Sequence, residues 1–332
     1  MTIVRPLLRL ASPGGGRGRL SVLVLHRVLP GPDPLYLEAM DAARFTEMCR
    51  WVASMFTVLP LDAAVHRLRQ RTLPERALAI TFDDGYADNR QVAMPILKSL
   101  GLPATVFVTT GFVDGGCMWN DIVIEAFRRT SRSTVDLHDL LPEADAQTFA
   151  LGSVMQRRIA LEAVIAAVKY FAADRRLDLV QRIAERLQVQ VPVDLMMTSA
   201  DVREWHRGGL QVGAHTVLHP ILAKLSLGEM RDEMKQSKDF LERLLGERVG
   251  LFAYPNGKPG EDYDERAVAL ARELGFDAAV TTARGAATHQ TDLFQLPRFT
   301  PWDRTRLRFG ARMLSTLWAS RRGVATAVEV GL

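Results

Sequence analysis

Two short segments hold the side chains best suited to chemistry. In the first, the apolar run that begins at Leu78 is followed directly by Asp83, Asp84 and Gly85. Two adjacent carboxylates can divide labour, because one can bind a metal ion while the other remains a base whose pKa is set by the cation beside it. Asp-Gly is also a common turn dipeptide, so this segment taken alone is equally compatible with a structural turn.

The second segment, Gln211 to Pro220, carries His215 and, four residues later, His219. At helical or tight-turn spacing both imidazoles can point at one cation. A lone histidine is usually a hydrogen-bonded polar residue, but this pair uses two of only seven histidines in the chain. Two histidines and one carboxylate leave coordination positions open, which is typical of a catalytic metal site.

Both segments follow apolar, β-branched runs that predict buried strands. Amphipathic patterns between such runs predict helices, and the clearest cover Asn89–Leu100 and Leu227–Leu245. This alternation predicts a parallel sheet covered by helices, in which active sites lie at the carboxyl ends of strands. The predicted strands are Leu20–Leu25, Ala77–Phe82, Ala104–Thr109, Leu210–Ala214, Val249–Ala253 and Ala278–Thr281.

Length and composition are compatible with this architecture. The chain has 332 residues, of which 48% are hydrophobic and 24% charged, so it could form one large barrel or two medium domains with a sizeable core. From Trp119 to Leu195 the strand pattern gives way to helical periodicity, and we interpret this stretch as a helical insertion between two barrel strands. Cys49 and Cys117 match no zinc pattern and are expected to be buried free thiols.

Basic charge is concentrated at both ends. The net charge is +4, but the first 32 residues hold five arginines and no acid, and residues 298–322 hold seven arginines against Asp303 alone. This distribution fits an anionic surface such as a membrane, or a solvated face. With no secretory signal and no run of ~20 apolar residues, the chain is expected to be soluble and cytoplasmic.

The C-terminal stretch offers a more specific hypothesis about location. On a helix, one apolar stripe would be flanked by arginines, as in a segment lying on an anionic membrane at its cytoplasmic face. The alternative is that the same stripe packs against the barrel as its last helix. The stripe is Leu307, Ala311, Leu314 and Trp318, and the flanking residues are Arg304, Arg308 and Arg312.

Three motifs together resemble the NodB-type polysaccharide deacetylases, carbohydrate esterase family 4. They are Thr81–Gly85 (TFDDG), the His-x-x-x-His of His215 and His219, and Phe252–Gly257 (FAYPNG), and their order and separation also match. The resemblance spans residues 20–300. Residues 23–28 and the Phe-Ala-Tyr-Pro segment look closer to the branch that acts on exopolysaccharides.

The resemblance implies a distorted (β/α) barrel in which Asp84, His215 and His219 hold a divalent metal, with zinc expected. Asp83 would be the general base, and the backbone N–H of Asn256 or its neighbour would help to bind the oxyanion. Together with the charge pattern of the two ends, this predicts a basic flexible N-terminus (1–19), the barrel (20–300, with the insertion at about 119–195) and a basic amphipathic C-terminal helix and tail (301–332).

The chain departs from the family pattern at three points. The arginine that often precedes the proline of the third motif is absent, and Arg298 is the substitute candidate for positioning the base. The usual aromatic residue at Asn256 is also missing. The Leu-x-His motif that commonly supplies the general acid is not recognisable, so His26, at the end of the first strand, is the preferred replacement and His289 the weaker one. His26 could equally be a structural residue.

The expected substrate is an N-acetylated polysaccharide or a lipid-linked glycan, with no nucleic-acid partner. Deacetylation of peptidoglycan or of chitin-like oligosaccharides would use the same centre and is the main alternative. A catalytically silent carbohydrate-binding relative would have no need of a metal triad with an adjacent base. A phosphoesterase would need more metal ligands than the sequence offers.

Overall fold

The computed structural model describes residues 4–142, 147–169 and 171–319. Its contacts divide the chain into two compact units. The barrel unit comprises Met1–Gly31, Met40–Val113 and Met197–Leu332, and the insertion unit comprises Pro32–Ala39 and Asp114–Met196. Every predicted site residue belongs to the barrel unit.

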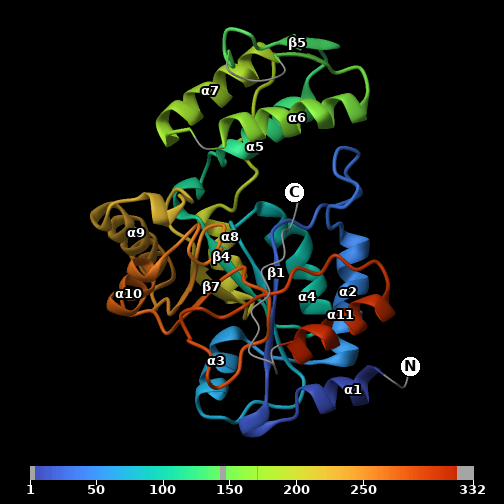
Figure 1. Cartoon of the computed structure of the whole chain (residues 1–332), viewed down its shortest axis with the longest axis vertical. Helices are drawn as coiled ribbons and strands as arrows, with labels where there is room; N and C mark the ends of the chain where they lie inside the picture. The colour runs from blue at the N-terminus through green and yellow to red at the C-terminus, as the bar shows by residue number, and fades with distance from the viewer. Residues whose placement is uncertain (1–3, 143–146, 170, 320–332) are drawn as a thin grey trace. The chain divides into compact units, whose positions relative to one another are not determined.

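A curled parallel sheet forms the centre of the barrel unit (Figure 1). Its strand order is β1-β3-β4-β7-β8-β9, and the short β2 pairs with the beginning of β3. This architecture confirms the predicted α/β barrel, and each predicted strand is present with its ends shifted by at most two residues. The strands are β1 (Leu20–Leu25), β2 (Thr57–Val58), β3 (Ala77–Phe82), β4 (Thr105–Val108), β7 (Gln211–Ala214), β8 (Leu251–Ala253) and β9 (Ala278–Val280).

The gap between the first and last strands is bridged by the segment 296–299, which is not itself a regular strand. On one side, Leu296 donates its N–H to Ala279 O (2.9 Å). On the other, Phe299 donates its N–H to Val22 O (2.8 Å) and accepts a bond from Val24 N. The distorted barrel therefore closes through a seam that contains Arg298.

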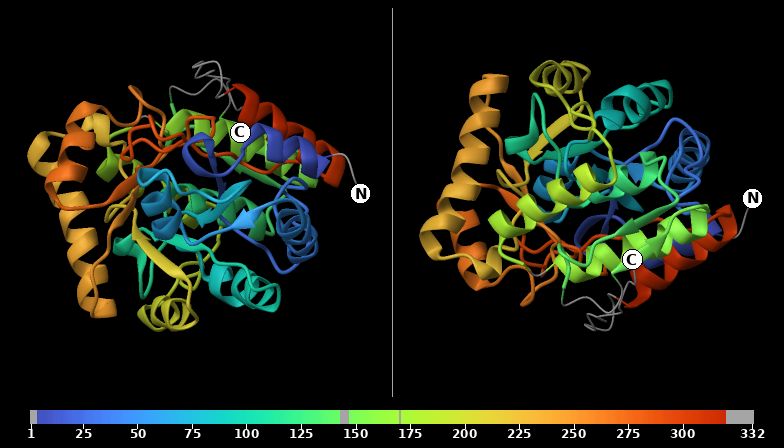
Figure 2. Two further views of the ribbon diagram at one scale, coloured as in Figure 1. Left: turned by 90° about the horizontal axis from the view of Figure 1, so that it is seen from below. Right: turned by 90° about the horizontal axis from the view of Figure 1, so that it is seen from above.

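Helices cover the outside of this sheet, with α9 and α10 on one side and α1, α2 and α11 on another (Figures 1 and 2). The predicted helix 227–245 is α9, which begins with a capping box at Ser226 and ends at Gly246 in the left-handed conformation. The predicted helix 89–100 is a π-helical turn (Asn89–Ala93) followed by α4. The α-helices of the barrel unit are α1 (Val4–Ala11), α2 (Ala42–Met55), α3 (Leu61–Arg69), α4 (Met94–Ser99), α8 (Ser199–Arg207), α9 (Leu227–Leu245), α10 (Glu265–Glu273) and α11 (Arg306–Ala319).

The insertion unit consists of α5 (Trp119–Arg129), α6 (Val154–Val168), α7 (Ala173–Arg186) and a two-stranded antiparallel sheet. The predicted helical insertion is therefore present, and it also contains a strand pair that the sequence did not predict, in which β5 (Thr134–Asp136) pairs with β6 (Thr148–Ala150). The segment Pro32–Ala39 is tied to α5 by the ion pair between Arg128 and the buried Asp33 (2.6 Å).

The N-terminal segment differs from the sequence prediction, whereas the C-terminal segment contains the predicted helix, α11. The N-terminal segment is not a flexible arm, since it contains α1, whose Leu8 and Ala11 are fully buried. The face of α11 that packs inward is Phe309, Met313 and Leu317, and the predicted stripe lies mostly outside, with Leu307 71% and Trp318 46% exposed. Residues 1–3 and 320–332 of the predicted terminal segments lie outside the described residues.

Other sequence predictions agree with the structure. Cys49 and Cys117 are both free and buried. No helix within the described ranges is long and apolar enough to cross a membrane.

Candidate active site

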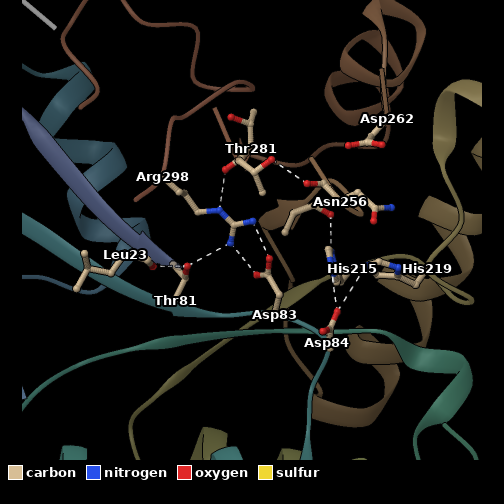
Figure 3. Close-up of polar contacts among 12 residues, drawn as sticks. Leu23, Thr81, Asp83, Asp84, His215, His219, Asn256, Asp262, Thr281 and Arg298 are labelled. Carbon is tan, nitrogen blue, oxygen red and sulfur yellow. Dashed lines mark hydrogen bonds and ion pairs between the residues drawn. The ribbon is translucent and has the colours of Figure 1, made fainter. Parts of the chain in front are cut away.

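The two adjacent carboxylates of the first motif lie immediately beyond the carboxyl end of β3. The parallel pairing with β1 continues one residue past the strand, because Asp83 donates its N–H to Leu25 O (2.9 Å). Asp84 (φ 76°) and Gly85 (φ 81°) then take up the left-handed conformation. This turn sends the two side chains to different neighbours, Asp83 toward Arg298 and Asp84 toward the histidines (Figure 3).

Asp84, His215 and His219 form a compact cluster of potential metal ligands. Asp84 Oδ1 lies 3.5 Å from His215 Nε2 and 3.5 Å from His219 Nε2. One ligand atom from each residue lies within 4.8 Å of the others, and among the described residues this is the one such group of histidine, cysteine and acidic side chains. The sequence prediction thus selected the residues that the fold brings together.

The hydrogen bonds of the cluster leave His215 Nε2 and Asp84 Oδ1 free to bind a cation. His215 Nδ1 lies 2.8 Å from the carbonyl oxygen of Ala253, an acceptor, so Nδ1 carries the proton and the lone pair of neutral His215 is on Nε2. Asp84 Oδ1 is buried without a hydrogen-bond partner in the described structure. A buried unsatisfied carboxylate oxygen is unfavourable unless a cation compensates it. The donor set therefore fits a divalent metal ion.

The electrostatics of the cluster link metal binding to pH. Burial would raise the pKa of Asp84, but the nearby histidines, His215 foremost, lower it well below its usual range. Burial lowers the pKa of His219 to about 4, so this imidazole is neutral at pH 7. For His215 the neighbouring carboxylates outweigh burial and raise the pKa. A proton and a metal ion therefore compete for the cluster.

The loop that carries His219 is held in a strained conformation by a residue that the sequence analysis missed. Thr216 (φ 65°) and His219 (φ 55°) both adopt the left-handed conformation, which is unfavourable for side chains of their kind. Glu233 on α9 accepts hydrogen bonds from Val217 N (2.8 Å) and Leu218 N (2.9 Å) through one carboxylate oxygen. Nothing in the local sequence distinguishes Glu233 from the other acids of α9.

Arg298 reaches Asp83 from the barrel seam and binds it through two parallel hydrogen bonds. Arg298 Nη1 lies 2.7 Å from Asp83 Oδ1 and Nη2 lies 2.7 Å from Oδ2, and both side chains are almost fully buried. Arg298 also donates from Nε to Thr281 O (2.8 Å) and from Nη1 to Thr81 Oγ1 (3.2 Å) (Figure 3). Burial would raise the pKa of Asp83, but the Arg298 charge and hydrogen bond, with a contribution from His215, lower it.

His26 lies beside this centre, whereas His289 does not. Leu25 O accepts the Asp83 N–H, so His26 follows directly at the same end of the sheet, with its side chain exposed. Its charge contributes to lowering the pKa of both Asp83 and Asp84. His289 follows Ala287, whose backbone pairs with Leu20 at the opposite end of β1. The weaker candidate for the general acid is therefore remote from the centre.

Asn256 follows β8 on the same rim of the barrel. It has φ 57°, and its carbonyl oxygen accepts a bond from Thr282 Oγ1 (2.8 Å). Within the described part of the chain, no hydrogen bond uses the Asn256 N–H. The exposed Asn256 thus leaves a backbone donor for a substrate at the position that the third motif predicted.

Comparisons with known proteins agree with this geometry. Residues 70–279 match the sequence profile of a family described as Polysaccharide deacetylase. YxkH of Bacillus subtilis (strain 168), whose name includes polysaccharide deacetylase, is 22% identical over 282 residues, which are 84% of this chain and 70% of that protein.

Two solved structures share the fold over almost their whole length. The Streptococcus pyogenes deacetylase PplD, in complex with acetate, has a TM-score of 0.58 and 20% identity, covering 90% of this chain and 98% of that one. IcaB from Ammonifex degensii has a TM-score of 0.58 and 19% identity, covering 91% of this chain and 98% of that one.

Proposed function

Because the chain belongs to the polysaccharide deacetylase family, of NodB type, we propose that it is a metal-dependent hydrolase that removes N-acetyl groups from a polysaccharide. One observation carries the proposal: the buried, unpartnered Asp84 Oδ1 faces two imidazole Nε2 atoms at 3.5 Å, beside a second carboxylate held separately by arginine. This arrangement provides a cation site and an independent base in one centre.

In this proposal Asp84, His215 and His219 hold the metal, and their nitrogen and oxygen donors suit zinc. When bound, the cation polarises the acetamide carbonyl and lowers the pKa of a water molecule. The three protein ligands leave further coordination positions free for water and substrate.

Asp83 is the general base. Arg298 keeps its carboxylate ionised and fixes its orientation, so Asp83 can take a proton from the water that attacks the acetyl carbon. The new carbon–oxygen bond places negative charge on the former carbonyl oxygen, and the free Asn256 N–H is available to bind that oxygen. His26 donates a proton to the sugar nitrogen as the carbon–nitrogen bond breaks, which releases acetate and a free amine.

The substrate proposed is an exopolysaccharide, either as polymer or as a lipid-linked glycan. Support comes from residues 23–28 and from the Phe-Ala-Tyr-Pro segment, which resemble the exopolysaccharide branch of the family. Peptidoglycan and chitin-like oligosaccharides remain the alternative substrates, because the same centre would act on them. A silent binding relative would not need the buried pair of Asp83 and Arg298.

Acetate release from a panel of acetylated glycans tests this proposal. The purified protein, stripped with a chelator and then reloaded with zinc, is incubated with a β-linked poly-N-acetylglucosamine, with peptidoglycan and with chitin oligomers. We expect zinc-dependent acetate release, fastest on the exopolysaccharide. Preference for another glycan would change the substrate, and absence of release from every glycan after reloading would overturn the proposed activity.

We also propose a peripheral contact with anionic lipid through α1 and α11. These helices pack against each other. Val4 lies so close to Gly310 that a Cβ atom added at Gly310 would come within 2.7 Å of a side-chain carbon of Val4. Outward they expose Leu10 (68%), Leu307 (71%) and Trp318 (46%). Apolar side chains among arginines suit the boundary between headgroups and acyl chains. The arginines of these two helices are Arg5, Arg9, Arg306, Arg308 and Arg312, and Arg304 lies just before α11.

A further inference from the structure

The segment that carries His26 has left the sheet but is still rigidly connected to it. The last strand-like bond of β1 is the one from Asp83 N to Leu25 O (2.9 Å). Beyond this bond, the backbone of residues 26–28 needs hydrogen-bond partners outside the sheet to hold it in one position. These partners come from the chain just after the carboxylate pair, where Asp88 and Asn89 are both buried.

Asp88 and Asn89 bind three consecutive residues of that segment. Asp88 Oδ1 accepts the Val28 N–H (2.9 Å), and Asp88 Oδ2 accepts from Arg27 Nε (2.8 Å). Asn89 Nδ2 donates to the carbonyl oxygen of His26 (2.7 Å) and also to Asp88 Oδ1 (3.2 Å). A carboxylate with both oxygens engaged fixes the position and the orientation of its partners.

This contact is unusual for a part of the structure that only needs to be packed. Asp88 is 5% exposed, and burial of its charge is unfavourable unless partners compensate it. The Arg27 guanidinium lies 5.0 Å from the ring centroid of Tyr86, so its position is fixed from a second side. The same short segment that delivers Asp83 and Asp84 therefore also determines where His26 stands.

We propose that Asp88 is a positioning residue, which holds the 26–28 segment so that the His26 imidazole stands over the acetyl-bearing nitrogen of the substrate. The inference rests on the proposed function. In this role Asp88 contacts neither substrate nor metal, because its two carboxylate oxygens accept hydrogen bonds from Arg27 and Val28.

The diagnostic measurement compares two leaving groups. An N-acetylated sugar expels an amine that must be protonated, whereas 4-nitrophenyl acetate expels a stable phenolate that needs no acid. In the zinc-loaded enzyme, Asp88→Ala should lower kcat for the sugar amide by roughly 10²-fold, the usual contribution of an acid group, and leave aryl ester hydrolysis within about 3-fold. Asp88→Asn, which keeps one acceptor oxygen, should give a smaller loss.

A double-mutant cycle with His26→Gln provides a second test of the positioning role. If Asp88 acts through His26, Asp88→Ala should cause almost no further loss of amide turnover in the His26→Gln enzyme. The positioning role would be overturned if the two substitutions reduced amide turnover independently, so that their fold losses multiplied in the double variant. Equal losses of amide and ester turnover in Asp88→Ala would also overturn it and indicate general damage to the centre.

Asp264 provides a matched control. Like Asp88, it accepts a backbone N–H through one oxygen (Arg266 N, 3.0 Å) and an arginine Nε through the other (2.8 Å), but it caps α10. Asp264→Ala should lower thermal stability without changing the ratio of amide to ester turnover.

Hydrogen exchange separates the failure of this inference from failure of the proposed function. The Val28 amide should exchange slowly in the wild-type protein and at least about 10-fold faster in Asp88→Ala, because its buried acceptor is gone. Unchanged Val28 exchange would overturn the inference even in an active enzyme. A wild-type protein that releases no acetate would overturn the proposed function and the catalytic part of this role together, whatever the exchange data show.

Discussion

At the scale of single residues, Asp83 and Asp84 are adjacent and of the same type, but their surroundings differ. Asp83 has both oxygens bound by Arg298, whereas Asp84 keeps one oxygen without a partner in the described structure, next to two histidines. Since the two groups have the same intrinsic chemistry, the difference in the roles proposed for them follows from the left-handed turn at Asp84 and Gly85, which gives the two side chains different neighbours.

Replacing Arg298 should move the acid limb of the pH profile. Arg298 is the main group that lowers the pKa of Asp83 against the effect of burial, so in Arg298→Gln that pKa should rise. Less of the base is then ionised at mildly acidic pH, and the acid limb of kcat/KM should shift to higher pH. Arg298→Lys keeps the charge and should shift it less.

Stability gives a second measure of the same pair. A carboxylate whose pKa is lowered on folding stabilises the native state above its unfolded pKa, and this contribution disappears as the pH falls through the folded pKa. Loss of one partner of a buried pair should cost about 3–5 kcal/mol at neutral pH. An unchanged acid limb together with unchanged stability in Arg298→Gln would show that Arg298 does not act on Asp83.

Removing a proposed metal ligand should empty the centre. In His215→Ala one of three protein ligands is lost, and metal content and acetate release should both fall to background, because an open catalytic site has no spare protein ligand. Elemental analysis after dialysis checks the first and a turnover assay the second. His289→Ala is the matched control and should retain both, since it lies at the opposite end of β1.

The sequence predicted the residues with recognisable chemistry but not those that hold them. Asp83, Asp84, His215 and His219 could be found because they stand in short motifs at strand ends. Glu233 and Asp88 act through backbone N–H groups on other segments, 15 and 60 residues away in the chain. Such contacts depend on tertiary placement, and an isolated acid in a helix or turn gives no signal of them.

At the scale of elements, the centre depends on the loop between β7 and the 3₁₀ turn Leu222–Lys224. His219 reaches the cluster only because this loop adopts two left-handed residues, and Glu233 on α9 compensates the exposed backbone donors. The helix α9 therefore covers the sheet and also fixes the position of His219, a proposed metal ligand.

Glu233→Ala should weaken the metal site without touching a ligand. Loss of the acceptor leaves the partly buried Val217 N–H without a partner and the exposed Leu218 N–H to solvent, which should lower stability by about 1 kcal/mol. Loss of such supporting contacts typically lowers metal affinity about 10–100-fold. Metal titration and thermal unfolding check both effects, with the exposed neighbour Asp232→Ala as control. Metal affinity equal to that of the wild type would contradict the supporting role.

Element prediction was accurate where strands were continuously buried and missed the strands that bury a single side chain. Apart from the two-residue β2, which was not predicted, the strands of the curled sheet are almost continuously buried runs, which sequence patterns identify well. β5 and β6 have only three residues each, with a single buried side chain in the middle, so no period is visible. In α11 two apolar stripes exist, and only packing against the barrel selects Phe309, Met313 and Leu317 as the buried one.

At the scale of the whole molecule, the two basic ends of the sequence meet on one surface of the barrel unit. α1 and α11 lie side by side although about 300 residues separate them along the chain (Figure 2). Charge asymmetry could be predicted from sequence, but the combination of both ends into one face could not.

This surface should bind vesicles that contain anionic lipid. In co-sedimentation at low salt we expect binding to phosphatidylglycerol vesicles, none to phosphatidylcholine, and a decrease as salt rises. Leu307→Ser with Trp318→Ser should weaken binding, and so should glutamine at Arg304, Arg308 and Arg312. Glutamine at the exposed Arg67, Arg69 and Arg207 removes the same charge elsewhere and should have little effect. No binding to anionic vesicles at low salt would contradict the proposal.

The central claim is that Asp84 binds the metal while Asp83 acts as the base, and one paired measurement tests it most directly. Metal content and acetate release are determined in parallel for Asp83→Asn and Asp84→Asn, two isosteric changes at adjacent positions. Asp83→Asn should retain about one metal ion per chain and lose roughly 10²–10⁴ in rate, the usual contribution of a general base. Asp84→Asn should lose the metal and the activity together. A metal-free Asp83→Asn, or an Asp84→Asn enzyme with full metal and normal turnover, would contradict the account.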